Sequence, residues 1–89
     1  MELYIHYTEL PENMPMTELV GQLNETLDDT GAVSGGLNKE KGGRIDLELE
    51  DERVNPKYAQ MAVKAYLQRA GFAKDTIIEI GGMEIGLYE

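Results

Sequence analysis

The chain has 89 residues, of which eight are basic and 17 acidic, and its formal net charge is −9. A chain this short is expected to form one domain, residues 1–89, around a single modest core. Because it contains no cysteine, disulfides, thiolate metal sites and thiol redox chemistry are excluded, and a reducing, cytoplasmic location is expected.

Acidic side chains are concentrated at the start of the chain. The first 38 residues hold seven carboxylates and neither lysine nor arginine, so this segment carries a charge of −7. Nucleic acids and anionic membranes are bound by clustered lysine and arginine, so neither is an expected partner. The sequence shows no secretory signal and no apolar run of the roughly 20 residues that cross a bilayer. A basic protein surface is the expected complement.

The first two elements are predicted by the spacing of their apolar side chains. The opening residues alternate, with Leu3, Ile5 and Tyr7 on one side, which is typical of a half-buried strand. After Pro15 the spacing becomes that of a helix, for which proline suits the first turn and Gly31 suits the C-terminal stop. The apolar stripe of this helix consists of Met16, Leu19, Val20, Leu23 and Leu27.

The middle of the chain predicts two further strands and a second helix. Ala32–Asn38 is a weak strand that contains a glycine pair, and a turn over residues 39–43 leads into a cleanly alternating strand over Arg44–Glu50. Asn55 and Pro56 have the residue types of an N-cap and a first helical position. The second helix is expected to bury Ala59, Ala62, Val63, Tyr66 and Ala70 and to end at Gly71.

The C-terminal residues complete the predicted fold. Ile77, Ile78 and Ile80 form a fourth strand, and the turn Gly81-Gly82 returns the chain into a short fifth strand. This order favours the α+β class, as a ferredoxin-like βαββαβ sandwich with two helices on one face of an antiparallel sheet and an extra C-terminal β-strand. Right-handed crossovers place strands one and three side by side, each with one apolar face, so the opposite sheet face is expected to be open.

This open sheet face is the first candidate site. In the expected register, its side chains combine an aromatic ring, an imidazole and a guanidinium with several carboxylates. Such a face is either a binding surface or an ordinary solvated face, because alternating polar residues occur wherever one side of a sheet is wet. The candidate residues are Tyr4, His6, Arg44, Asp46, Glu48 and Glu50, with Glu79 expected beside them.

The acidic side of the first helix is the second candidate. Glu18, Glu25 and Asp28 form its predicted solvent side and could act together as a recognition patch. The ordinary alternative is again a solvated face. The glycine-weakened strand Ala32–Asn38 is in addition a candidate edge for strand addition by a partner.

Catalytic and metal-binding patterns are weak. His6 is the only histidine and Ser34 the only serine, and nothing in the sequence joins them, so no hydrolytic triad is predicted. One histidine without cysteine does not make a zinc site. The acidic run over residues 48–52 points successive carboxylates to opposite faces and lacks a calcium loop. We therefore predict no catalytic residue, no metal ligand and no cofactor.

Two functions remain open on the sequence alone, beside the possibility of a purely structural accessory domain. The first is a small acidic, non-enzymatic protein–protein interaction module, for example an inhibitor or immunity-type protein, that docks a basic partner. The second is a ferredoxin-like homodimer that binds or transforms a small molecule between paired sheets, with Tyr4, His6 and Asp46 lining the cavity. Like charges meeting across the two-fold axis argue against the dimer.

Overall fold

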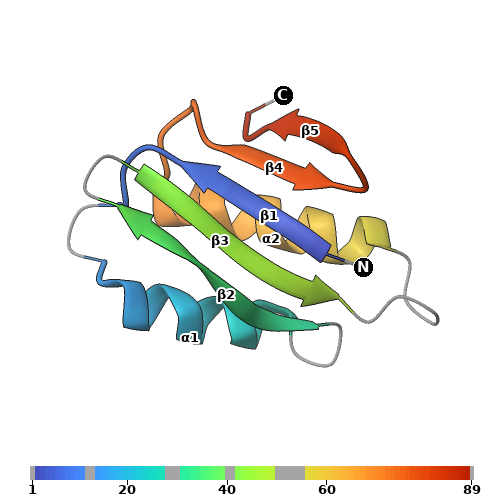
Figure 1. Cartoon of the computed structure of the whole chain (residues 1–89), viewed down its shortest axis with the longest axis horizontal. Coiled ribbons are helices and arrows are strands. Elements are labelled where there is room, and N and C mark those ends of the chain that lie inside the picture. The colour runs from blue at the N-terminus through green and yellow to red at the C-terminus, as the bar shows by residue number, and fades with distance from the viewer. Residues whose placement is uncertain (1, 12–13, 28–30, 40–41, 50–55, 89) are drawn as a thin grey trace.

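Two helices cover one face of a five-stranded antiparallel sheet in this computed structural model (Figure 1). The structure describes residues 2–11, 14–27, 31–39, 42–49 and 56–88. This α+β architecture is compatible with a ferredoxin-like fold. Its elements are β1 (Glu2–Tyr7), α1 (Met16–Leu27), β2 (Gly31–Lys39), β3 (Gly42–Leu49), α2 (Pro56–Ala70), β4 (Ile77–Ile80) and β5 (Met83–Gly86).

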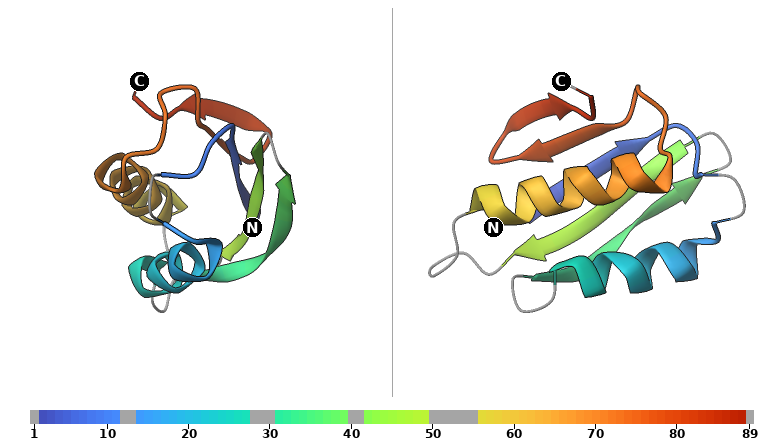
Figure 2. Two further views of the ribbon diagram at one scale, coloured as in Figure 1. Left: turned by 90° about the vertical axis from the view of Figure 1, so that its left-hand side faces the viewer. Right: turned by 180° about the vertical axis from the view of Figure 1, so that it is seen from behind.

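The sheet has the strand order β2-β3-β1-β4-β5, and every neighbouring pair is antiparallel. β1 therefore lies at the centre, between β3 and β4, which confirms the predicted contact between strands one and three. Figure 2 shows both helices on the same side of the sheet, so the other side, which faces the viewer in Figure 1, has no helix over it.

The core follows from the two-residue period of the central strands. Leu3 pairs with Leu47 and Ile5 pairs with Ile45, and each of these side chains is at most 2% exposed. Leu49 is buried in the same way. Since successive side chains of a strand point to opposite faces, burying this set leaves the alternate residues on the open face. The predicted apolar face of Arg44–Glu50 is confirmed over the described residues.

Each helix buries one stripe against this apolar face. On α1 the buried residues are Leu19, Leu23 and Leu27, while Met16 and Val20 are only partly covered. On α2 the predicted stripe missed Leu67, which is fully buried, and included Ala62 and Ala70, which are only partly buried. Among the side chains of α2 that the structure describes, the buried ones are Ala59, Val63, Tyr66 and Leu67.

The end of α2 is fixed by a glycine, as predicted. Gly71 has a φ of +91°, a backbone conformation that residues with a Cβ rarely adopt. Its N–H donates to the carbonyl of Gln68 at 3.2 Å, and the N–H of Phe72 donates to the carbonyl of Leu67 at 3.1 Å. These two bonds form a Schellman motif, which satisfies carbonyls at the helix end and turns the chain toward β4.

The prediction for Gly31 was wrong, because this glycine opens β2 instead of ending α1. A Cβ at this position would lie 2.5 Å from the carbonyl oxygen of Glu48, so glycine permits a close approach of β2 to β3. β3 also begins earlier than expected, at Gly42. Asn55 and the centre of the turn at residues 40–41 lie outside the described residues.

The C-terminal hairpin agrees with its glycine pair. Gly81 and Gly82 have φ values of +58° and +80°, which the two-residue turn requires. β5 ends at Gly86, and Leu87 follows it as a fully buried core residue. The N–H of Leu87 donates to the carbonyl of Thr76 at 3.1 Å, which holds this end of the chain against the core.

The division of β3 into a buried and an open face can be tested with two neighbouring substitutions. We expect Leu47→Ala to lower the free energy of unfolding by about 2–5 kcal/mol, because it leaves a cavity in the core. Glu48→Ala, one residue further on the other face, should change it by about 0.5 kcal/mol or less. Urea denaturation measures both values, and equal losses would contradict the assigned faces.

Candidate functional site

The open face of the sheet brings the candidate residues of three strands together. Tyr4 of β1 lies between Asp46 of β3 and Glu79 of β4. One step along the strands, His6 lies opposite Arg44 of β3. These five residues are separated widely in sequence, and only the strand order brings them side by side. The predicted cluster is thus assembled, apart from Glu50, which lies outside the described residues.

Arg44 and Asp46 form the most extensive contact on this face. Arg44 Nε donates to Asp46 Oδ1 at 2.6 Å, and Nη2 donates to Oδ2 at 3.2 Å, which is a bidentate geometry. The guanidinium carbon also lies 5.4 Å from the centre of the Tyr4 ring, within range of a cation–π contact. The hydrogen bond and the charge of Asp46 together raise the pKa of Arg44. This arginine is therefore held in place and already neutralised by its own strand.

His6 and Tyr4 are also held by carboxylates. His6 Nε2 and Glu79 Oε1 are 2.9 Å apart, with both side chains about one-third exposed. The Tyr4 hydroxyl donates to Glu2, and this hydrogen bond is the main cause that raises the pKa of Tyr4. The rings of Tyr4 and His6 lie 6.4 Å apart and tilted at 45°. The site is an organised polar network on a strand scaffold.

Carboxylates outnumber cations on this face. Among the described side chains it carries Glu2, Asp46, Glu48, Glu79 and Glu84 against the single guanidinium of Arg44, a net charge of −4 with His6 neutral. Two pairs of carboxylates lie directly opposite each other on neighbouring strands. Like charges at directly opposed positions destabilise a sheet, yet this face has two such pairs. These opposed pairs are Glu2 with Glu48 and Glu79 with Glu84.

The helix face carries a more balanced charge. Glu18 and Glu25 are exposed on α1 as predicted, whereas Asp28 lies outside the described residues. Among the described side chains, α1 has two carboxylates, while α2 has the cations Lys64 and Arg69. The acidic residues of α1 therefore face a helix of opposite charge. This compensation favours the sheet face over α1 as the acidic surface of the molecule.

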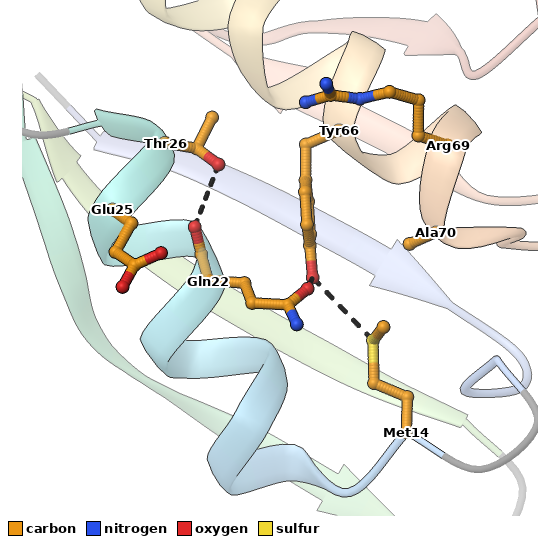
Figure 3. A pocket seen from close by; sticks show the side chains of 7 residues that line it. All are labelled: Met14, Gln22, Glu25, Thr26, Tyr66, Arg69 and Ala70. Atoms are coloured by element: carbon orange, nitrogen blue, oxygen red, sulfur yellow. Dashed lines mark hydrogen bonds between the residues drawn. The ribbon is translucent and has the colours of Figure 1, made fainter.

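A shallow hollow of about 590 Å³ lies between the two helices (Figure 3). Tyr66 of α2 points across it to α1, where its hydroxyl donates to Gln22 Oε1 at 2.5 Å and lies 3.7 Å from the sulfur of Met14. Glu25 and Arg69 also line the hollow, one from each helix. Its lining mixes both charges with neutral groups, and two of its polar side chains, Tyr66 and Gln22, already bond each other.

Glu84 and the hollow between the helices were not predicted from the sequence. Glu84 could have been found, because the two-residue turn Gly81-Gly82 fixes the register in which it lies opposite Glu79. The hollow depends on how α1 and α2 sit side by side, which no local pattern of residues gives.

Metal binding finds no support in the described part of the chain, where no group of three or more histidine, aspartate or glutamate side chains is arranged to hold an ion. None of the helices within the described residues combines the length and apolarity needed to cross a bilayer. Comparison with known proteins found no match: no family model fits the sequence, and no curated protein and no solved structure is significantly similar to the chain.

The buried hydroxyl of Tyr66 makes a prediction for alkaline pH. Burial and the charge of Glu18 raise the pKa of Tyr66, while Arg69 lowers it. Because the pKa is raised in the folded state, the stabilisation that the protonated Tyr66 hydroxyl contributes is complete below about pH 10. It is lost as the pH rises through the pKa of the folded protein.

We expect Tyr66→Phe to reduce the loss of stability above about pH 10, and to lower stability at pH 8 by about 0.5–1.5 kcal/mol because the bond to Gln22 is gone. Urea denaturation across this pH range measures both effects. A residual alkaline loss is expected from Tyr7, whose pKa burial also raises. An unchanged alkaline slope in the variant would contradict the role of Tyr66.

Proposed function

We propose that this protein is a non-enzymatic interaction module whose open sheet face docks a positively charged protein surface. The observation that carries the proposal is the two pairs of directly opposed carboxylates, Glu2 with Glu48 and Glu79 with Glu84, on a face that no helix covers. A local arrangement that works against folding is expected where function requires it. Cations of a partner placed between these carboxylates would remove the repulsion on binding.

The strand order supports a finer assignment of the fold. A sheet in which β1 lies between β3 and β4, with β2 outside β3, has the order expected of a ferredoxin-like sandwich. β5 then adds a strand beyond β4. We assign the chain to this class on that order, and fold class alone indicates no activity. The function is therefore argued from the face itself.

The contacts of His6 and Ser34 support binding over catalysis. His6 bonds Glu79, whereas the Ser34 hydroxyl donates to the backbone carbonyl of Asp46 at 3.3 Å. The only serine and the only histidine thus have separate partners, and a nucleophile needs its base within hydrogen-bond reach. An inhibitor or immunity-type protein that covers a basic surface of its target is one role that fits such a face.

Sheet-to-sheet dimerisation is the alternative, since Tyr4, His6 and Asp46 do lie close together and could line a cavity between two copies. Two faces of net charge −4 would then meet across the two-fold axis. Charge repulsion favours docking of a basic partner over this dimer. Sedimentation distinguishes the two, because the docking module is expected as a single chain at physiological salt.

The sheet face and the acidic side of α1 can be compared with two charge-matched variants. The first replaces Glu48 and Glu84 by glutamine, and the second replaces Glu18 and Glu25 by glutamine. All four side chains are exposed, so each variant loses two surface carboxylates. A fluorescently labelled lysine-rich peptide serves as the probe in an anisotropy titration at low salt.

We expect the sheet variant to bind the probe about fivefold to tenfold more weakly and the helix variant less than about twofold more weakly, because each docked charge contributes up to about 1 kcal/mol. Affinity of the native chain should also fall steeply as salt is added. Equal losses in the two variants, or an affinity that ignores salt, would contradict docking on the sheet face.

A further inference from the structure

β2 forms one edge of the sheet, and in the described residues no strand pairs with its outer side. An edge strand presents N–H and C=O groups that can pair with an added strand. The first part of β2 is protected, because the N–H of Val33 donates to Asn24 Oδ1 of α1 at 2.8 Å and a bulge follows between Val33 and Gly35. From Gly35 to Lys39 the strand then pairs with β3 in an unbroken register.

An apolar groove runs beside this part of the edge. It has a volume of about 200 Å³ and lies where α1 passes over β2. This is smaller than the roughly 300–1,000 Å³ of small-molecule sites, so it suits one apolar side chain of a peptide. Leu37 beside it is 52% exposed. The groove is lined by Met16, Val20, Val33, Gly35, Gly36, Leu37, Arg44 and Ile45.

Gly36 cannot be replaced without disturbing the edge. Its φ is +150°, and a Cβ there would lie 2.3 Å from the carbonyl oxygen of Arg44. Gly35 has no such constraint, since the nearest atom to its Cβ position is Asp46 Oδ2 at 4.0 Å. The glycine pair therefore leaves the backbone of β2 bare at the point where the groove opens.

The open-face side of β2 is bordered by carboxylates. Two of its residues there are short: Ala32 lies next to Glu48 and Gly35 lies next to Asp46, whereas the exposed Leu37 lies next to Arg44. A strand added outside β2 would lie two strand spacings, about 10 Å, from β3. A lysine or arginine of that strand opposite Gly35 can extend over Gly35 and Ala32 toward Glu48, because neither residue has a bulky side chain, while Asp46 already holds Arg44.

We propose that the outer edge of β2 binds an extended segment of the basic partner in which apolar and basic residues alternate. Its backbone pairs with Gly35–Lys39, an apolar side chain enters the groove beside Val20, and basic side chains lie over the open face. The basic charge of the partner is taken from the proposed function, and the inference rests on that proposal. A second copy of this chain does not fit the edge, because each copy carries a net charge of −9.

A peptide of about eight residues that alternates valine with lysine is the probe for this edge. Its controls are a peptide of the same composition with its valines and lysines in separate blocks, and the alternating peptide with N-methyl groups on its central backbone amides. Anisotropy gives the affinities. Amide chemical shifts of the ¹⁵N-labelled protein locate the contact. The groove is tested by Val20→Gln, with Thr17→Gln, at an exposed position of the same helix, as the matched control.

We expect the alternating peptide to shift the amides of Gly35, Gly36 and Leu37, and to bind about tenfold or more tightly than its N-methylated form, which lacks the backbone donors. Val20→Gln should weaken this binding and Thr17→Gln should not. Equal binding of all three peptides, with shifts confined to β1 and β4, would overturn strand addition while leaving charge-driven docking intact. If N-methylation weakens binding but the variant without Glu48 and Glu84 binds the peptide as tightly as the native chain, strand addition at the edge is supported and docking on the acidic face is contradicted.

Discussion

Alternate residues of β1 and β3 are divided between a dry and a wet face, and this division determines where the helices pack and where the polar side chains lie. Leu3 and Ile5 meet Leu47 and Ile45 on the dry face, where both helices pack. Because the side-chain period of a strand is two, a one-residue slip of either strand would move the apolar side chains of that strand to the wet face. The same pairing therefore fixes the position of each polar residue on the wet face, without any contact among those residues being needed to hold the fold.

This coupling explains how a small domain can keep an unfavourable charge arrangement. Burial of the apolar face stabilises the chain by far more than a few surface repulsions destabilise it, so Glu79 and Glu84 can remain opposed. Arg44 is already neutralised by Asp46, and the charges of the helix layer nearly cancel. The open face is thereby left with a net charge of −4 among its described side chains, and in the proposed function this charge steers and orients a basic partner.

Much of this arrangement follows from local patterns in the sequence. The alternation in residues 2–7 and 44–49, and the glycine pair Gly81-Gly82, predicted strands, buried face and hairpin in agreement with the structure. Features that depend on contacts between distant parts of the chain could not be predicted from these local patterns. The role of Gly31 depends on its close approach to β3, and without β3 it has the pattern of a helix C-terminus. His6 bonds Glu79, which is 73 positions away. The groove beside β2 depends on where α1 crosses the sheet.

If the negative charge of the open face lowers stability, removing one of its carboxylates should raise it. Thermal unfolding of Glu84→Gln tests this most directly. Glutamine keeps the size of the side chain and removes the charge opposite Glu79, so we expect stability to rise by about 0.5 kcal/mol at low salt and the gain to shrink as salt is added. Glu25→Gln, an equally exposed change on α1, should show no such gain. A loss of stability in Glu84→Gln, or the same gain in both variants, would contradict the view that the charge of the open face lowers stability.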